Sequence, residues 1–286
     1  MDSDGTNFET IRSLRQELTF KEATAIFEKQ GLKFGAEQQR TLELITEDGY
    51  VKAGATVAVL DIQDELGQQV VDHANTLGDG KATYYHCNVS NREEVFSVFE
   101  QAAKDMGGLD VLAHVAGVER MGAAEDFTED QMQFVWSVNI NGTIFTNQAA
   151  QKIMAEQEGE FAIINFVSDA GLAGMANSAL YAASKGSVFS WSRTIAYEWA
   201  IKYNIRTNCV NPTMKTPMYE QYLAGLEPAT REAFLKAERL KVPMKGEMGD
   251  VDRDMAPVMV FLASDASSYI NGQIIPLNGG RNMLRG

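Results

Sequence analysis

The chain has 286 residues with 25 Lys or Arg and 39 Asp or Glu, so its formal net charge is −14. With 45% hydrophobic and 22% charged residues, it has the composition of a globular protein that is long enough to bury a large core. The net negative charge argues against a nucleic-acid-binding surface, which needs clustered Lys and Arg.

The cysteines and histidines argue against a disulfide-bonded protein and against a metal-binding protein. Cys87 and Cys209 lie far apart with no CxxC spacing, so we expect no disulfide framework and a reducing, cytoplasmic environment. His73, His86 and His114 lack the spacing of metal ligands, so we expect no metal site. The start of the chain is acidic and polar, unlike a secretory signal, and no apolar run reaches the length of a membrane span.

The first 53 residues allow two interpretations. A capping-box pattern at residues 19–22 predicts a helix, and residues 36–48 also have helical character. The alternative makes residues 23–27 a first parallel strand that is followed by a turn over 30–35. The pattern does not decide between them, so we treat 1–53 as an atypical, irregular helical segment of the same domain.

From residue 54 to the end of the chain, short β-branched runs alternate with helix-length amphipathic stretches. The expected strands are 55–60, 82–86, 111–114, 161–167, 205–210 and 273–277, and the expected helices are 64–77, 91–105, 128–156, 179–203 and 251–263. This alternation predicts a single α/β domain over 54–286, built on a doubly wound parallel sheet. Residues 214–247 interrupt the pattern and form either the cover of a pocket or a surface helical hairpin.

Polar residues follow several of the expected strands. They are Asp61, Asn88, Ser168 and Asn211, and Ala116-Gly117 follows the fourth strand. Ligands of open parallel sheets bind beyond the carboxyl ends of the strands, so these residues predict a binding site.

Tyr181 and Lys185 have the spacing that places two side chains on the same face of a helix. An ammonium group beside a phenol lowers the pKa of the phenol, and such a tyrosine can exchange a proton with an alcohol or a carbonyl. Ser168 ends a buried strand 13 residues earlier. The alternatives are an exposed polar pair for Tyr181 and Lys185, and a helix or turn cap for Ser168.

Several motifs together resemble the short-chain dehydrogenase/reductase family. They are Ser168 with Tyr181-AAS-Lys185, Asn139 in SVNINGTIF, Val210-Asn211-Pro212 with Thr216-Pro217-Met218, and the ending FLASDASSYINGQIIPLNGG. The resemblance covers about residues 54–280. It implies a Rossmann-like fold and an oxidoreductase that interconverts a secondary alcohol and a ketone.

The resemblance also implies roles for four residues. Tyr181 would be the general acid/base, and Lys185 would lower its pKa and hold the nicotinamide ribose. Ser168 would bind the reacting oxygen, and Asn139 would hold a water molecule in the proton relay. The nicotinamide cofactor supplies the hydride.

The implied cofactor is NAD, because Asp61 would bind the adenosine ribose and repel a 2′-phosphate. The alternative for Asp61 is a cap of the following helix. The expected cofactor-binding residues are Gly31, Gly35, Asp61, Asn88, Val89, Ala116, Gly117, Tyr181, Lys185, Pro212, Thr213 and Thr216. The expected substrate-binding residues are Ser168, Met175, Tyr181, Met214 and Met218, which suggests an apolar ketone or secondary alcohol.

The departures from the family pattern all lie on the cofactor side. The nearest match to the family's TGxxxGxG turn is residues 30–37, where Glu37 replaces the third glycine. His114-Val115 stands in place of the family's Asn-Asn, Asn88 in place of an acidic residue, and Thr213 in place of glycine. The alternative function is therefore a non-redox protein of the same fold, an isomerase, a cyclase-type enzyme or a binding protein, with impaired dinucleotide binding.

The expected helix 179–203 carries apolar residues around more of its circumference than one sheet face requires. They are Val188, Phe189, Trp191, Ile195 and Trp199. A helix that is apolar on two sides is buried on two sides, so we expect a homodimer or homotetramer, by family resemblance with this helix at the interface.

Overall fold

The computed structural model describes residues 40–43, 47–215, 219 and 223–283. They belong to one compact unit, Ala36–Gly286. The described part contains a seven-stranded sheet in the order β3-β2-β1-β4-β5-β6-β7, with every neighbouring pair parallel. The strands are β1 (Arg40–Glu43), β2 (Thr56–Asp61), β3 (Lys81–His86), β4 (Val111–His114), β5 (Phe161–Phe166), β6 (Ile205–Pro212) and β7 (Ile274–Leu277).

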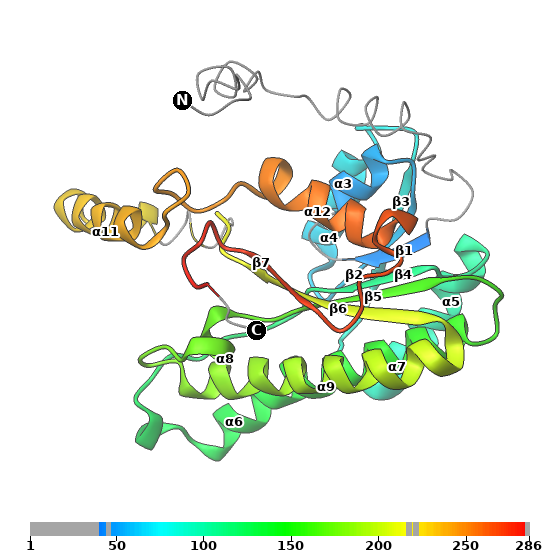
Figure 1. Ribbon diagram of the computed structural model, residues 1–286, viewed down its shortest axis with the longest axis horizontal. Helices are drawn as coiled ribbons and strands as arrows, with labels where there is room; N and C mark the ends of the chain where they lie inside the picture. The colour runs from blue at the N-terminus through cyan, green and yellow to red at the C-terminus, as the bar shows by residue number, and fades with distance from the viewer. Residues whose placement is uncertain (1–39, 44–46, 216–218, 220–222, 284–286) are drawn as a thin grey trace, which may run out of the picture. The chain divides into compact units, whose positions relative to one another are not determined.

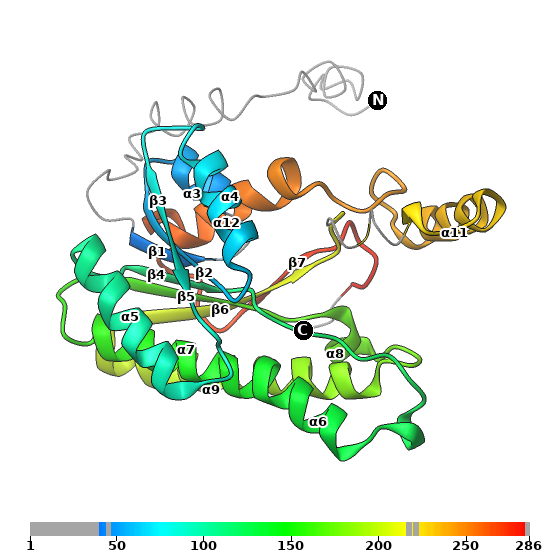
Figure 2. The same cartoon turned by 180° about the vertical axis from the view of Figure 1, so that it is seen from behind.

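Helices cover both faces of the sheet, as Figures 1 and 2 show. One face carries α3 (Glu47–Lys52), α4 (Asp64–Ala74) and α12 (Ala256–Ala263), and the other carries α5 (Arg92–Met106), α7 (Thr143–Met154) and α9 (Ala179–Tyr203). The other helices are α6 (Glu129–Trp136), α8 (Asp169–Ala173) and α11 (Pro228–Lys241), with 3-10 turns at Ala124–Asp126 and Asp265–Ser267. The prediction of a doubly wound α/β sheet is confirmed.

Local sequence explains where these elements begin and end. Every residue of β5 is buried, as expected for a central strand covered by helices on both faces. Asn91 caps α5 by accepting a hydrogen bond from the Glu94 N–H, and Gly107 ends α5 in the left-handed conformation with φ 81°. The largest core cluster lies under the α5, α7 and α9 face and includes Leu60, Phe99, Leu112, Met154, Ile163 and Trp199.

The helix expected over 36–48 is wrong. Residues 40–43 form β1, which pairs with β2 on one side and β4 on the other, and α3 begins only at Glu47. Backbone pairing on both sides outweighs the helical preference of this short stretch. The sheet therefore begins earlier than the expected boundary at residue 54. The alternative strand over 23–27 lies outside the described residues.

The helix expected over 128–156 is interrupted. It consists of α6, a π-helical turn (Ser137–Gly142) and α7. A second π-helical turn, Val251–Met255, precedes α12. Such turns often occur at functional sites, and the first one contains Asn139.

The strand order reverses between β1 and β4, because β2 and β3 continue from β1 while β5 to β7 continue from β4. The loops at the carboxyl ends of these strands diverge at this point and leave a crevice in sheets of this kind. The polar residues that the sequence places after the strands therefore lie along one edge of the sheet.

Candidate active site

Lys185 is the buried cation of this edge. It lies on α9 with 6% of its surface exposed, and its Nζ donates a hydrogen bond to the Phe166 carbonyl at the end of β5, at 2.9 Å. The same Nζ lies 5.8 Å from the centre of the Tyr181 ring. Burial lowers the pKa of Lys185 to about 8.

Tyr181 lies within the first turn of α9, which begins at Ala179. Burial raises the pKa of its phenol, a hydrogen bond with Ser168 lowers it, and the charge of Glu119 raises it. Together these effects raise the pKa of Tyr181 above its ordinary value. The sequence predicts that Lys185 lowers this pKa. In the structure, the largest effect is the partial removal of Tyr181 from water, which raises it.

Ser168 has the capping role that the sequence offers as its alternative. It is the N-cap of α8, where its hydroxyl accepts a hydrogen bond from the Ala170 N–H at 3.2 Å. Its hydroxyl also interacts with the phenol of Tyr181. The capping contact fixes the Ser168 side chain at the end of β5, beside Tyr181.

Asn139 links two elements through its side chain. Its Oδ1 accepts from the Val118 N–H at 2.7 Å, and its Nδ2 donates to the Val118 carbonyl at 2.8 Å and to Ser184 Oγ at 2.9 Å. Its own carbonyl accepts from the Thr143 hydroxyl. Asn139 therefore fastens the loop after β4 to α9.

Gly117 lies where this loop passes Lys185. A Cβ atom at Gly117 would lie 3.4 Å from both Lys185 Nζ and Asn139 Oδ1, at the near limit of van der Waals contact. The absence of a side chain lets the backbone after β4 approach the ammonium group. Neighbouring Ala116 packs against the core.

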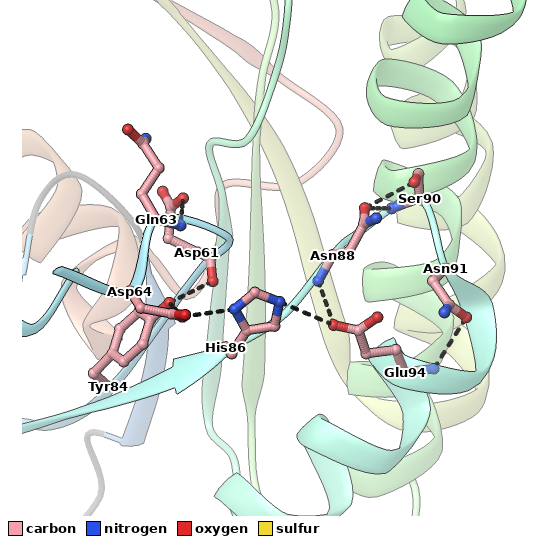
Figure 3. A network of polar contacts seen from close by, with 9 residues as sticks. All are labelled: Asp61, Gln63, Asp64, Tyr84, His86, Asn88, Ser90, Asn91 and Glu94. Carbon is pink, nitrogen blue, oxygen red and sulfur yellow. Dashed lines mark hydrogen bonds and ion pairs between the residues drawn. The ribbon is translucent and has the colours of Figure 1, made fainter. Parts of the chain in front are cut away.

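A second polar cluster lies at the carboxyl ends of β2 and β3 (Figure 3). Asp61 Oδ1 accepts from the Gln63 N–H at 2.9 Å. The N-cap residue of α4 is Gln63, so Asp61 is not the helix cap that the sequence offers as its alternative role. The Tyr84 hydroxyl lies 2.7 Å from the Asp61 carbonyl and 2.8 Å from Asp64 Oδ1. These contacts fix the turn that carries Asp61.

His86 lies between two carboxylates of this cluster (Figure 3). Its Nδ1 is 2.6 Å from Asp64 Oδ1, and its Nε2 is 3.9 Å from Glu94 Oε1. The hydrogen bond with Asp64 raises the pKa of His86 and lowers that of Asp64. Glu94 also accepts from the Asn88 N–H at 2.8 Å.

The other expected cofactor-binding residues lie along the same edge. Asn88 Oδ1 accepts from the Ser90 N–H and hydroxyl, and Val89 packs against Gly142. Pro212 ends β6, and the Thr213 N–H donates to the Leu277 carbonyl. Thr216, Gly31 and Gly35 lie outside the described residues.

The connection after β1 differs from the expectation for a glycine-rich turn. Only residues 44–46, Leu-Ile-Thr, separate β1 from α3, which has six residues and begins with Glu47 and Asp48. The glycine match at 30–37 precedes β1 in the chain, whereas the turn that holds a pyrophosphate follows the first strand.

Comparisons with known proteins identify the family. The family model described as Enoyl-(Acyl carrier protein) reductase matches residues 48–282. The chain is 34% identical over 232 residues to the 3-oxoacyl-(acyl-carrier-protein) reductase of Thermotoga maritima, which covers 81% of this chain and 89% of that protein. The chain belongs to the short-chain dehydrogenase/reductase family.

Solved structures of the family agree with this fold. A putative short-chain alcohol dehydrogenase from Sinorhizobium meliloti is 31% identical with a TM-score of 0.76, and the match covers 85% of this chain and 96% of that one. An NAD+-bound xylitol dehydrogenase is 26% identical with a TM-score of 0.77, covering 87% and 100%. Oxidoreductases of the family use a nicotinamide dinucleotide and act on small molecules.

The site fits such a dinucleotide at its two ends more closely than at its centre. Lys185, Tyr181 and the bare backbone of Gly117 suit the nicotinamide ribose, and Asp61 suits the adenosine ribose. The three-residue connection 44–46 contains no glycine to approach a pyrophosphate, and the two acidic residues that follow it disfavour an anion.

The expected substrate residues are distributed along the outer part of the site. Met175 is 47% exposed in the loop before α9. Met214 packs against Gly249, which pairs with it in an isolated β-bridge. Met218 lies outside the described residues, and the ring of Tyr219 contacts that of Phe234 on α11. In the described part of the 214–247 insertion, α11 is the principal helix.

Sequence reasoning missed two polar contacts of this site. The buried Ser178 hydroxyl donates to Glu119 Oε1 at 2.9 Å, across 59 residues, and no local pattern signals this contact. His114 Nδ1 lies 3.0 Å from the Thr146 hydroxyl, and its Nε2 is buried without a hydrogen-bond partner. The only sign of His114 in the sequence is that it stands where the family pattern has an asparagine. Burial, followed by the charge of Lys185, lowers the pKa of His114 to about 3.

The two perturbed histidines should separate in an NMR titration. His86 should titrate above its ordinary value near 6.5, because Asp64 stabilises the imidazolium. Its contribution to stability is therefore present below pH 6.5 and disappears as the pH rises through the folded pKa. His114 should stay neutral down to about pH 3.

Asp64→Asn should return the pKa of His86 toward 6.5 and leave that of His114 unchanged. Assignments come from His86→Gln and His114→Asn. A His86 signal that titrates at or below 6.5 in the unsubstituted protein contradicts the arrangement in Figure 3.

Proposed function

We propose that the chain is an NAD(H)-dependent oxidoreductase that interconverts a secondary alcohol and a ketone. The observation that carries the proposal is the cluster of Ser168, Tyr181 and buried Lys185 at the strand-order reversal of a sheet with the family fold. These groups can hold a proton at one atom, orient a carbonyl oxygen and keep a positive charge close by.

Each residue of the cluster has a separate role in the proposed reaction. Lys185 and Asp61 would hold a nicotinamide dinucleotide, which when bound would supply or accept the hydride of the substrate carbon. Tyr181 Oη gives a proton to the ketone oxygen or takes one from the alcohol, while the Ser168 hydroxyl hydrogen-bonds the same oxygen. Lys185 would hold the nicotinamide ribose. Asn139 would hold a water molecule of the proton relay, in addition to its contacts with the loop after β4.

The protonation states favour the reducing direction at neutral pH. Since burial raises the pKa of Tyr181, its phenol carries a proton and serves as a general acid. Oxidation of the alcohol needs the phenolate, so the rate of oxidation should increase as the pH rises. Lys185 loses its charge above about pH 8.

The proposed cofactor is NAD, because the second oxygen of Asp61 would accept a ribose hydroxyl and both would repel a 2′-phosphate. The cofactor would also lie against Asn88, Val89, Ala116, Gly117, Pro212 and Thr213, with Gly31, Gly35 and Thr216 as expectations from the sequence. Met175, Met214 and Met218 would take the apolar part of a ketone or alcohol. The buried free cysteines support a reducing, cytoplasmic environment.

One observation favours a second candidate function. Residues 44–46, between β1 and α3, lack the glycines of the turn that usually binds the pyrophosphate. In that case the protein is a non-redox member of the family, an isomerase, a cyclase-type enzyme or a binding protein. Nucleotide binding decides between the two candidates.

The outer faces of α7 and α9 are the proposed contact for a homodimer or homotetramer. They form a groove together with the π-helical turn before α7, lined among others by Ile144, Ala183, Ser187, Phe189 and Trp191. Val188, Ile195 and Trp199 of the same helix face the chain's own core instead. Within the described residues, no helix is both long enough and apolar enough to cross a membrane.

Tyr181→Phe should lower turnover about 100-fold or more, because it removes the proton that the reaction needs and leaves the ring in place. The assay uses NADH with a panel of cyclic and aromatic ketones. Tyr197→Phe is the matched control, since Tyr197 lies on the same helix with 74% of its surface exposed. Equal turnover by the two variants would refute the role of Tyr181.

A calorimetric titration with NADH and NADPH tests the cofactor. The unsubstituted protein should bind NADH more tightly, and Asp61→Asn should reduce that preference about tenfold by removing one charge next to the 2′ position. Glu65→Gln is the control on the neighbouring helix. The absence of binding by either nucleotide at millimolar concentration supports the second candidate function.

Ser187→Arg should convert the oligomer to a monomer, because it places a charge in the groove between α7 and α9. Light scattering at micromolar concentration measures the mass, and circular dichroism confirms that the variant is folded. A monomeric unsubstituted protein under the same conditions contradicts the proposed contact.

A further inference from the structure

We propose that His86 is a specificity-determining residue of this site, which makes the choice between NAD and NADP depend on pH. The imidazolium offsets part of the negative charge around Asp61 and so tolerates the 2′-phosphate of NADP, whereas the neutral imidazole does not. The preference for NAD therefore increases as the pH rises. The inference rests on the proposed function only for the place of the adenosine ribose, beside Asp61.

His86 lies directly beside Asp61. The two residues end β3 and β2 and are register partners in this parallel pair, in which neighbouring strands lie about 4.8 Å apart. The His86 side chain is 54% exposed, so a bound ligand can reach the ring. A surface hollow lined in part by Gln63, Asp64 and Leu66 borders the same turn. A group on the 2′ position of a ribose held by Asp61 is therefore within reach of His86.

Two carboxylates hold the His86 ring in this place (Figure 3). Its Nδ1 lies 2.6 Å from Asp64 Oδ1, and its Nε2 lies 3.9 Å from Glu94 Oε1. The carboxylates are themselves fixed, Asp64 by the Tyr84 hydroxyl and Glu94 by the Asn88 N–H. Only the imidazolium places a positive charge between the two carboxylates, so these surroundings favour the protonated ring. The hydrogen bond with Asp64 is the main reason that the pKa of His86 is raised.

The charges that face His86 come from three neighbouring elements. Asp61 of β2, Asp64 of α4 and Glu94 of α5 each contribute a negative charge to the surroundings of the ring. The Tyr84 hydroxyl, on the same strand as His86, stays uncharged because burial raises its pKa. In the part of the chain that the structure describes, no lysine or arginine forms an ion pair with any of these three carboxylates. Protonation of His86 therefore offsets one of the three negative charges of this cluster.

The charge of His86 matters for a 2′-phosphate and not for a bare ribose. The phosphate adds close to two negative charges at neutral pH. Next to Asp61 and Asp64 it meets like charges, which a neutral imidazole does not offset. The imidazolium attracts the phosphate and can form a charge-assisted hydrogen bond with it. A ribose without the phosphate is uncharged, so its binding to Asp61 does not depend on the protonation of His86.

The test compares the binding of adenosine and adenosine 2′-phosphate between about pH 5.5 and about pH 8.5, by ligand-observed NMR. In the unsubstituted protein, the ratio of the dissociation constant of the phosphate to that of adenosine should rise about tenfold more than in His86→Gln, as expected for one charge at close range. His86→Gln keeps only the rise that comes from ionisation of the phosphate itself, near about pH 6. His73→Gln, which changes an exposed histidine of α4, should behave like the unsubstituted protein. The same pH dependence in His86→Gln and the unsubstituted protein overturns the proposal.

A second measurement uses the unsubstituted protein alone. Saturating adenosine 2′-phosphate should raise the pKa of His86 in an NMR titration, because a bound phosphate stabilises the imidazolium, whereas adenosine should leave this pKa unchanged. An unchanged pKa with the phosphate, or no binding of either probe, overturns the proposal. Neither probe contains a nicotinamide or a pyrophosphate. A protein that shows both effects of His86 but converts no ketone therefore refutes the redox function alone.

Discussion

The site depends on one buried charge. Lys185 is removed from water on a long helix, and its ammonium group is compensated by a single carbonyl at the end of β5. Burying an ammonium group is costly, and here burial moves the pKa of Lys185 down to about 8. The α9 helix must therefore sit against the end of β5, which also brings Tyr181 beside Ser168 and Lys185 close to the backbone of Gly117.

The part of this arrangement that the sequence predicts is the part that local spacing encodes. Tyr181 and Lys185 lie one turn apart, and the apolar run before Ser168 identifies a buried strand. The sequence does not reveal the role of the Asn139 side chain or the contact of Glu119 with Ser178, because these contacts join residues 21 to 59 positions apart. Likewise, β1 has no strand pattern of its own, and its conformation comes from pairing with β2 and β4.

The two ends of the crevice match the family pattern to different degrees. At the Tyr181 end the family's polar groups are present and linked by hydrogen bonds. At the other end, Asp61 is retained, but residues 44–46 between β1 and α3 contain no glycine and are followed by acidic residues. In the proposed function, the two ribose ends of a dinucleotide would supply most of its binding energy.

NMR of the protein with 13C at the Cε of lysine tests this account most directly. One lysine signal, identified with Lys185→Met, should titrate near pH 8, below the ordinary lysine value of about 10.5. The same signal should shift when NADH is added. A Lys185 signal that titrates at the ordinary lysine value of about 10.5 and does not respond to NADH would contradict the assignment of this buried charge to a dinucleotide site.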